Sequence, residues 1–423
     1  MGIFIQKIKH LISDSSLRTR VLFTIAGLVI FRLLATIPVP GVNKEALANL
    51  FANNQFLGLI DIFSGGGLST ISIVMLGVGP YITASIIMQL LTMIFPKLKE
   101  MYSEEGDAGR RKFIQYSRLL TVPLALLQSF GYLLLLSKQG AILPLGNFEM
   151  LVNVVTIATG SLILMWLGEL ITEFGVGNGM SLLIFAGIVA RLPIVIGQLI
   201  STFDISQIPL YLAFTLASLV IIAAVVFITE AERPIPVTYA KRIRGNKVYG
   251  GVSTYIPLRL NQAGVIPIIF ALSLLLFPQM IFTFMNTLSL VWVKTIASYG
   301  LAFLSNHLAY GIAYFFLVVL FTYFYTAVTF DPHSIADNLQ KNGAFIPGVR
   351  PGESTTKYIG SIVTRITLVG ATFLGFIAVL PLIVQSLTGI QSLAIGGTAL
   401  LIVVNVVTDL VKKLDAQLSI REY

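Results

Sequence analysis

The chain has 423 residues, of which 56% are hydrophobic and 11% charged, and its net charge is +9. So apolar a composition excludes a soluble globular protein of this length. The absence of cysteine excludes disulfides, thiolate catalysis and zinc ligation through sulfur. Apolar runs of about 17 to 25 residues recur, which is the length that crosses a hydrocarbon core as a helix. The runs do not alternate as barrel strands do, so they predict an all-α polytopic membrane protein.

The first twenty residues, MGIFIQKIKHLISDSSLRTR, are basic and weakly amphipathic and contain no small-residue cleavage site. We expect a retained cytoplasmic arm and not a signal peptide. Ten spans are predicted after it, near residues 21–37, 72–95, 118–137, 152–172, 180–200, 210–229, 262–284, 307–330, 365–385 and 392–411.

The distribution of Lys and Arg predicts the orientation of these spans. With the amino terminus inside, the inner segments hold 23 of the 28 basic residues and the outer loops hold three. Basic residues gather in cytoplasmic loops, so both termini are expected in the cytoplasm.

The middle of the chain is a short outer loop, STFDISQIP at 201–209, with five predicted spans on each side. We therefore divide the chain into an N-terminal half, 1–200, and a C-terminal half, 201–423. Two halves with an odd number of spans have opposite orientations in the membrane, an arrangement typical of proteins with a pathway between the halves.

Basic residues are concentrated in two predicted inner loops, 97–118 and 233–259. A third, 331–364, contains GAFIPGVRPGES, centred on Arg350. Such charges can simply fix topology and meet anionic lipids. Loops of this length also favour docking of an acidic protein or of ribosomal RNA phosphates.

Signs of covalent chemistry are absent from the sequence. It contains no HExxH motif and no P-loop, and no cofactor is expected. Charges in the spans are few: Arg32 and Glu169 lie within reach of span ends and are expected to extend toward the membrane surface, and Arg191 is embedded. The alternative function, an ion-coupled secondary transporter with inverted repeats, would need more charged side chains within its spans. A structural scaffold for membrane assembly is a further alternative. The three consecutive glycines at 65–67, which break the second span near its start, disfavour it.

Several strings, in order along the whole chain, identify a resemblance to the SecY family, the channel subunits of the bacterial Sec protein translocase. They are IPVPGV (37–42), FSGGGLS (63–69), PYITASIIMQLL (80–91), EEGDAGRRKFIQYSR (104–118), MWLGELITEFGVGNGMSLLIFAGIVA (165–190), GVIPIIF (264–270), TFDPHSIADNLQKNGAFIPGVRPGE (329–353) and GGTALLIVV (396–404).

The resemblance implies two inverted five-helix halves around an hourglass pore, and a protein-conducting channel in place of an enzyme. It also explains the run DIFSGGGLSTISIVMLGVGPYITASIIMQLL (61–91), which three glycines interrupt. Residues 56–70 would form a plug and 71–91 a true span. The plug and its hinge would include Asp61, Ile62, Phe63, Gly65, Gly66 and Gly67.

The resemblance further implies a pore ring of branched aliphatic side chains, which excludes water yet yields to a passing chain. Its members would be Val78, Ile82, Ile184, Ile266, Ile269 and Ile402. The first two are spaced i,i+4 and Ile266 and Ile269 are spaced i,i+3, so each pair shares a helical face. Val78 is smaller than the isoleucine frequent at that position in the family.

A lateral gate for membrane segments is implied between the second and third spans of one half and the seventh and eighth of the other. Gln89, Gln128 and Asn261 are the polar residues expected in spans near this seam. The loops 231–259 and 331–364 would bind the SecA motor or the ribosome through Arg242, Arg244, Lys247 and Arg350. Other implied partners are SecE, SecG, precursors bearing signal peptides and anionic lipids, in a bacterial plasma membrane.

Overall fold

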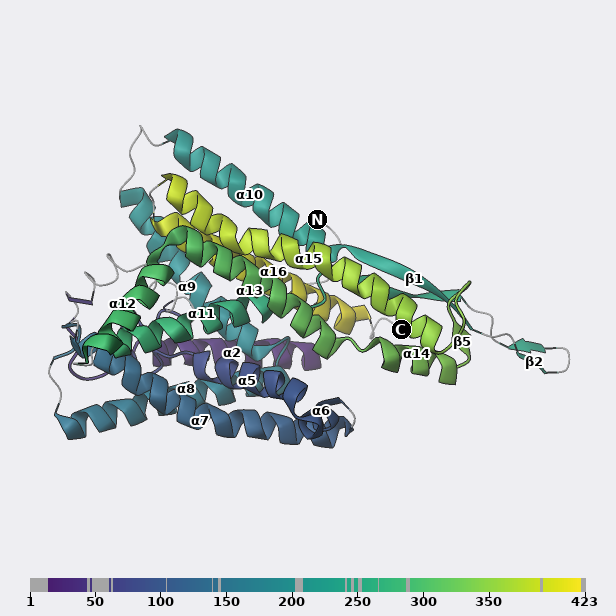
Figure 1. The fold of residues 1–423 in the computed structure, drawn as a ribbon, viewed down its shortest axis with the longest axis horizontal. Coiled ribbons are helices and arrows are strands. Elements are labelled where there is room, and N and C mark those ends of the chain that lie inside the picture. Colours follow the sequence, from purple (N-terminus) through teal and green to yellow (C-terminus); the bar gives the residue numbers. More distant parts are fainter. Residues whose placement is uncertain are drawn as a thin grey trace.

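The computed structural model describes most of the chain, and helices dominate it (Figure 1). The residues that it describes are 14–43, 46–47, 61, 64–103, 105–138, 140–143, 146–201, 208–239, 242–244, 247–249, 253–264, 266–286, 290–388 and 391–419.

Each of the first five predicted spans overlaps one long helix. Asp14 begins the first of these helices by accepting hydrogen bonds from the backbone N–H groups of Ser16 and Leu17, at 2.9 and 3.4 Å. The helices of this half are α2 (Ser15–Ala35), α5 (Gly79–Ile94), α6 (Pro96–Ser103), α7 (Gly106–Lys138), α8 (Asn147–Phe174) and α9 (Gly179–Ser201).

The other five predicted spans likewise overlap helices, and two small sheets lie between them. The elements are α10 (Ile208–Glu230), β1 (Glu232–Tyr239), β2 (Arg242–Arg244), β3 (Lys247–Tyr249), β4 (Ser253–Arg259), α11 (Ile266–Met285), α12 (Val291–Ser305), α13 (His307–Thr329), α14 (Pro332–Lys341), β5 (Ala344–Phe345), α15 (Glu353–Thr388) and α16 (Gln391–Ser419).

The prediction of a continuous span over 71–91 is wrong. Residues 64–71 and 73–78 form turns, Ser72 pairs with Pro38 in an isolated β-bridge, and helix α5 begins only at Gly79, with a proline in its first turn. Ile71 and Gly77 have φ angles of 43° and 57°, outside the range of a right-handed helix. The sixteen residues of α5 extend about 24 Å, less than the roughly 30 Å of a hydrocarbon core. The turns therefore supply part of the crossing.

Helix boundaries also differ from the predictions on both sides of the spans. The predicted loop 97–118 is instead α6 and the first turns of α7, and α15 begins twelve residues before its predicted span. Helix α12, between α11 and α13, was not predicted. Its 15 residues extend about 22 Å, which is too short for a crossing.

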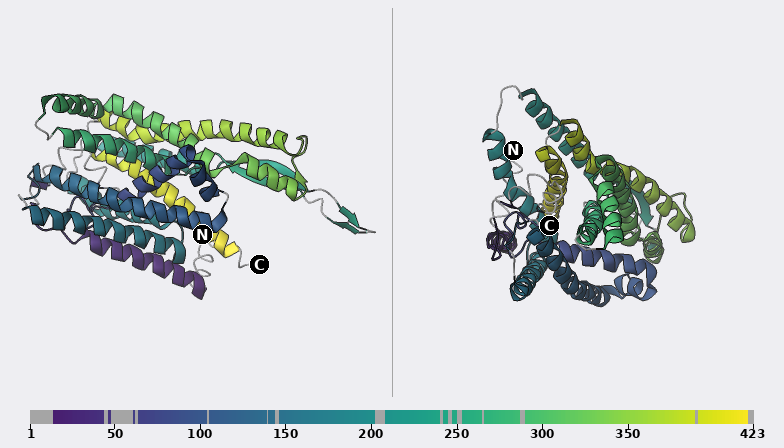
Figure 2. Two further views of the ribbon diagram at one scale, coloured as in Figure 1. Left: turned by 60° about the horizontal axis from the view of Figure 1, so that its bottom comes forward. Right: turned by 60° about the vertical axis from the view of Figure 1, so that its left-hand side comes forward.

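The three-stranded sheet has the order β4-β1-β5 and is antiparallel throughout. It packs on α14 and the beginning of α15 through a small core that includes Ile235, Leu258 and Ile362. Strands β2 and β3 form a separate hairpin. Both sheets lie at one end of the helical bundle, and the hairpin extends farthest (Figures 1 and 2).

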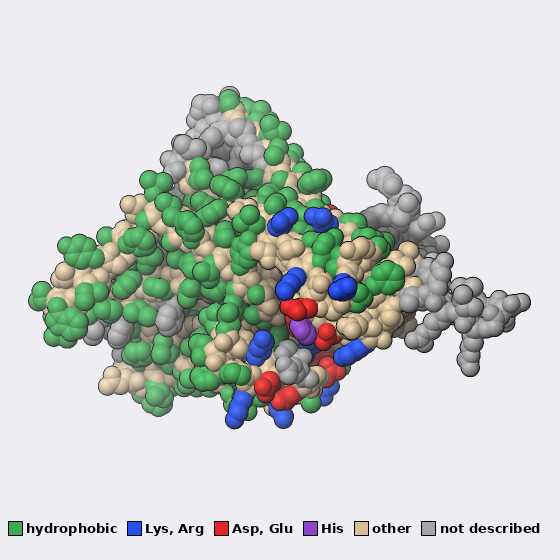
Figure 3. Space-filling view, turned by 45° about the vertical axis from the view of Figure 1, so that its right-hand side comes forward, with side chains coloured by type: hydrophobic (Ala, Val, Ile, Leu, Met, Phe, Trp, Pro, Cys, Tyr) green, Lys and Arg blue, Asp and Glu red, His purple; other side chains and the backbone are tan. Residues whose placement is uncertain are grey.

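The surface has an apolar part and a charged part. In the view of Figure 3 the charged side chains gather toward the end that carries the sheets, whereas the opposite part shows mainly hydrophobic side chains. Among the described residues, four helical segments are long and apolar enough to cross a membrane, and the bent pair α5–α6 makes a possible fifth. The fold is that of a polytopic helical membrane protein, and the number of ten spans stays a prediction.

Candidate functional site: an apolar constriction between two groups of helices

The contacts between helices divide them into two groups. In the first group α7 packs on α5 and α8, and α8 on α9; in the second α13 packs on α11 and α15, and α15 on α16. Two seams join the groups. Helix α9 meets α16 at one seam, and α11 meets α5 and α7 at the other.

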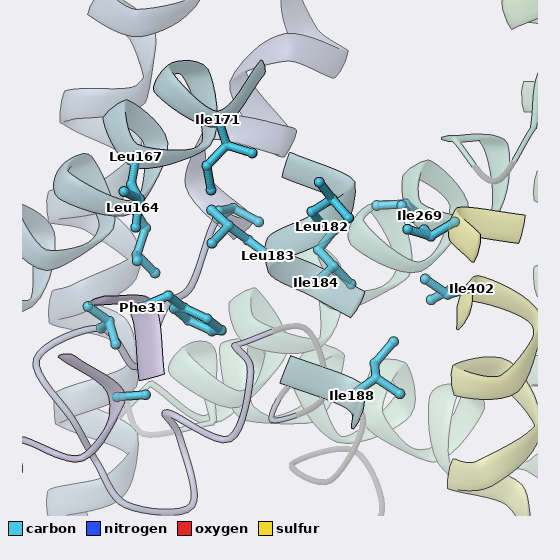
Figure 4. Close-up of a cluster of buried hydrophobic side chains, with 14 of the residues drawn as sticks. Phe31, Leu164, Leu167, Ile171, Leu182, Leu183, Ile184, Ile188, Ile269 and Ile402 are labelled. Carbon is cyan, nitrogen blue, oxygen red and sulfur yellow. The ribbon is translucent and has the colours of Figure 1, made fainter. Parts of the chain in front are cut away.

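Four of the six predicted ring residues lie in one buried cluster between the two groups. Val78, Ile184, Ile269 and Ile402 are 2%, 2%, 7% and 1% exposed, and they come from four different elements. Figure 4 shows the last three close together, on α9, α11 and α16. Ile82 packs against the same cluster. The side chains thus close the space where the two seams converge.

Ile266 is not a member of this cluster. It packs against the neighbouring apolar cluster of α11, α13 and α15, yet it lines the same cavity as Ile82, Ile184 and Ile269. Five of the six predicted positions therefore belong to or pack on one buried cluster, and Ile266 joins three of them only at the cavity wall; their role as a pore ring stays a prediction.

A cavity of about 400 Å³ opens directly onto the constriction. A second cavity, of about 600 Å³, continues from it between α5, α6 and α7 on one side and α13 and α14 on the other. Tyr81, Ser85, Gln89 and Ile114 line both cavities, so the two form one funnel. The funnel lies on the side of the sheets and leads toward the seam of α5, α7 and α11.

The funnel has charged side chains close to its apolar floor. The Arg118 Nε atom lies 2.8 Å from Glu169 Oε1, which joins α7 to α8, and Glu173 lines the same cavity. We expected Glu169 to extend from a span end toward water; it is instead ion-paired. Within the described residues no group of three His, Asp or Glu side chains could hold a metal ion.

The glycine-rich turn at 64–67 is packed tightly against α2 and α9. Gly65 and Gly66 have φ angles of 70° and 84°, which glycine adopts without strain. Asp61 is fully buried, and its carboxylate accepts a hydrogen bond from the Ser69 N–H group at 2.7 Å. Ile62, Phe63 and residues 56–60 of the predicted plug, 56–70, lie outside the described residues.

The polar residues expected at the lateral gate have different environments. Gln89 lies on α5 at the funnel wall, and its side-chain oxygen is buried with no hydrogen-bond partner among the described residues. Gln128 lies on α7 and is partly exposed. The expectation that Asn261 lies in a span is wrong. It precedes α11, and its side chain closes a turn by hydrogen bonds with the Gly264 backbone at 2.9 and 3.2 Å.

The residues predicted for docking lie beyond the apolar part of the molecule. Arg242, Arg244 and Lys247 belong to the β2–β3 hairpin, and their side chains lie outside the described set. Arg350 is exposed in the turn between β5 and α15. Its carbonyl accepts a hydrogen bond from the Thr355 hydroxyl at 2.9 Å, which fixes this turn on the first residues of α15.

An apolar constriction at the junction of two helical groups, with a funnel above it, defines a membrane channel or transporter as the class of protein. The comparisons specify which one. The family model described as SecY matches residues 72–411, so the chain belongs to the SecY family of protein translocase subunits. The SecY subunit of Mycobacterium tuberculosis is 44% identical to it, over 96% of each chain. The SecY subunit of Corynebacterium glutamicum is 42% identical, over 97% of each chain.

Solved structures agree on the fold. "The structure of a protein conducting channel" matches with a TM-score of 0.66 at 20% identity, over 95% of this chain and 93% of that chain. "Sec61 in the Canine ribosome-channel complex from the endoplasmic reticulum" matches with a TM-score of 0.62 at 18% identity, over the same fractions. The predicted SecY fold is thereby confirmed.

Proposed function

We propose that the apolar constriction is the ring through which this channel passes unfolded polypeptides. The observation that carries the proposal is the convergence of Val78, Ile184, Ile269 and Ile402 beneath a funnel. A narrow apolar ring excludes water and therefore ions when it is empty. Aliphatic side chains make no directional bonds, so they can surround an extended chain of any sequence.

The seam between α5 and α7 on one side and α11 and α13 on the other is the route by which membrane segments leave for lipid. The funnel extends into this seam, and Gln89 faces it with a buried oxygen that no other described residue pairs. An unpaired polar atom in an apolar contact is costly, so the contact between the two walls is weak at that point. An apolar helix that enters the funnel can therefore separate them.

The glycine turn 64–67 is the hinge of the segment that acts as the plug, residues 56–70. A solved relative at 20% identity is described as a SecY protein whose plug domain stabilises the closed state and maintains a membrane seal. The same role for residues 56–70 agrees with the break in the second span. The glycine turn connects that segment to the ring residue Val78 through the chain 68–77.

The protein acts in the bacterial plasma membrane with both termini in the cytoplasm, clamped by SecE and assisted by SecG. The SecA motor or the ribosome docks on the sheets through the hairpin of Arg242, Arg244 and Lys247 and through Arg350. These basic side chains suit acidic protein surfaces and RNA phosphates. Anionic lipids meet the same face, and precursors with signal peptides are the cargo.

Disulfide formation tests the ring, because the chain contains no cysteine. An Ile82→Cys variant, reconstituted with its partners, receives a precursor that carries one cysteine and is stalled in transit. We expect a disulfide that depends on the motor and the signal sequence. Leu216→Cys, at an exposed site on α10, is the matched control. Crosslinks confined to the control would refute the ring, and failure of any precursor to associate would favour a solute transporter.

A further inference from the structure

Arg32 holds the glycine turn from the end of α2. Its Nη1 atom donates a hydrogen bond to the Gly65 carbonyl at 2.9 Å. The side chain is partly buried, and no ion pair joins Arg32 to any acidic residue of the described part of the chain. We expected a side chain that extends to the membrane surface; the structure instead directs it to a backbone carbonyl 33 residues away.

The turn at Gly65 has no room for a side chain on Gly65 or on Gly187. A Cβ atom on Gly65 would lie 2.2 Å from Phe31 Cζ, and one on Gly187 would lie 2.2 Å from Gly65 Cα. The turn is thus clamped between α2 and α9. A carbonyl in a turn lacks a helical partner, and at membrane depth it must be satisfied by a side chain. Arg32 supplies that donor.

The position of the turn is transmitted to the ring through residues 68–78. Backbone hydrogen bonds tie this segment to the residues that follow α2, from Val39 N–H to the Ile71 carbonyl at 2.8 Å and from Ile73 N–H to the Ile37 carbonyl at 3.0 Å. At its far end the Ser161 hydroxyl donates to the Gly77 carbonyl at 2.9 Å, one residue before Val78. Val78 therefore sits on backbone that is held at both ends.

We propose that Arg32 is a positioning residue for the pore ring: its bond to Gly65, with the Gly65–Gly187 contact, stabilises the sealed arrangement in which Val78 meets its partners on α9, α11 and α16. The inference rests on the proposed function of the ring. When helices α2 and α9 separate, the Gly65 carbonyl loses its donor Arg32, and the turn loses its contact with Gly187 at the same time. The seal is then weakened from one wall alone.

An Arg32→Met variant removes the donor and the charge but keeps an unbranched side chain. Reconstituted with its partner subunits, it should leak ions without a precursor about 10 to 150 times more than the unaltered channel, the factor that corresponds to the loss of a hydrogen bond to a charged group. It should also pass a precursor with a weakened signal segment. Arg20→Met, on the exposed surface of the same helix, should match the unaltered channel in both assays.

A second pair of variants tests the clamp without altering any charge. Gly187→Ala should leak in the same way, because the added methyl group displaces Gly65. Gly197→Ala, on the same helix with nothing within 4 Å of the new Cβ, should not. If Arg32→Met does not accumulate in the membrane, the comparison of Gly187→Ala with Gly197→Ala tests the proposal by itself.

Equal leak for Arg32→Met and the unaltered channel would overturn the proposal, as would equal leak for the two glycine variants. An equal increase from Arg20→Met would also overturn it, because any charge on α2 would then suffice. If the unaltered protein transports no precursor at all, the proposed function itself fails, and this result is distinguishable because it does not depend on Arg32.

Discussion

The two halves of the molecule deliver Val78 and Ile269 to the constriction in different ways. In the C-terminal half Ile269 stands on a regular helix, α11, which begins at Ile266 directly after a closed turn. In the N-terminal half Val78 ends a run of turns, 64–78, that α2, α8 and α9 hold by backbone and side-chain hydrogen bonds and by close glycine contacts. One wall of the constriction is therefore stiffened by its own helix, and the other depends on its neighbours.

A shared feature lies beneath this difference. In each half, the fourth long helix places a glycine against the backbone that precedes the second long helix. The fourth helices are α8 and α15, and the second helices are α5 and α11. A Cβ on Gly160 of α8 would lie 2.0 Å from the Ile73 carbonyl oxygen, and one on Gly370 of α15 would lie 2.4 Å from the Leu260 carbonyl oxygen. Equivalent contacts at equivalent places are what an inverted repeat predicts. The comparison teaches that the backbone scaffold is common to both halves, whereas the break belongs to one.

The largest expected effect comes from filling these glycine contacts. Gly160→Ala and Gly370→Ala should each destabilise the folded protein by about 1 to 3 kcal/mol or more, since a backbone carbonyl must move. Thermal unfolding of the purified protein in detergent measures the loss. Gly360→Ala, on α15 with its nearest neighbour at 3.8 Å, is the control and should unfold like the unaltered protein. A large loss in one half alone would contradict the shared scaffold.

The turns before the two second helices should differ in sensitivity. Asn261→Ala removes two hydrogen bonds in a buried turn, so we expect a loss of about 1 to 3 kcal/mol. Ser161→Ala removes one bond between membrane-embedded elements, for which about 0.6 kcal/mol is average. Thr156→Val, which removes a bond within α8 only, serves as the control. The reverse order of the first two losses would show that the broken wall is the more rigid one.

The smallest effects concern one ion pair in each half. Arg118–Glu169 joins α7 to α8 at 2.8 Å, and Lys412–Glu230 joins α16 to α10 at 2.9 Å; all four side chains are partly exposed. Double-mutant cycles with glutamine should give coupling energies of about 0.2 to 1 kcal/mol for each pair. The value for Arg118–Glu169 should be the larger, because Glu169 is only 18% exposed. Coupling that persists unchanged in high salt would contradict this account.

Much of the architecture was predictable from the residues. Uninterrupted apolar runs indicated helical spans, and every predicted span overlaps a helix. The positions of Val78, Ile184 and Ile402 came from the resemblance to the SecY family, since taken singly each is an ordinary apolar residue. The break was evident from the three glycines, but its length was not. The run from Ile71 to Val78 is as apolar as any span, and only contacts with distant segments keep it from forming helix.

Other features escaped because their cause lies outside the local sequence. Helix α12 follows a predicted span without a strong boundary, so its residues merged with an expected loop. Arg32 and Glu169 were expected to point toward water, whereas each has a partner brought close by folding, the Gly65 carbonyl and Arg118 respectively. Asn261 was predicted to lie in a span because its neighbours are apolar, although its own short side chain is suited to closing a turn.

The sequence by itself determined that this chain is a membrane protein built from apolar helices, where its basic segments lie, and which family it belongs to. These properties depend on composition and on local strings, and the cost of unpaired backbone groups in lipid leaves helices as the form of such runs. Only the tertiary structure decided which apolar side chains meet at the constriction, how far the second span is unwound, and what Arg32 binds. Each of these depends on contacts between residues tens to hundreds of positions apart, whose geometry no local pattern contains.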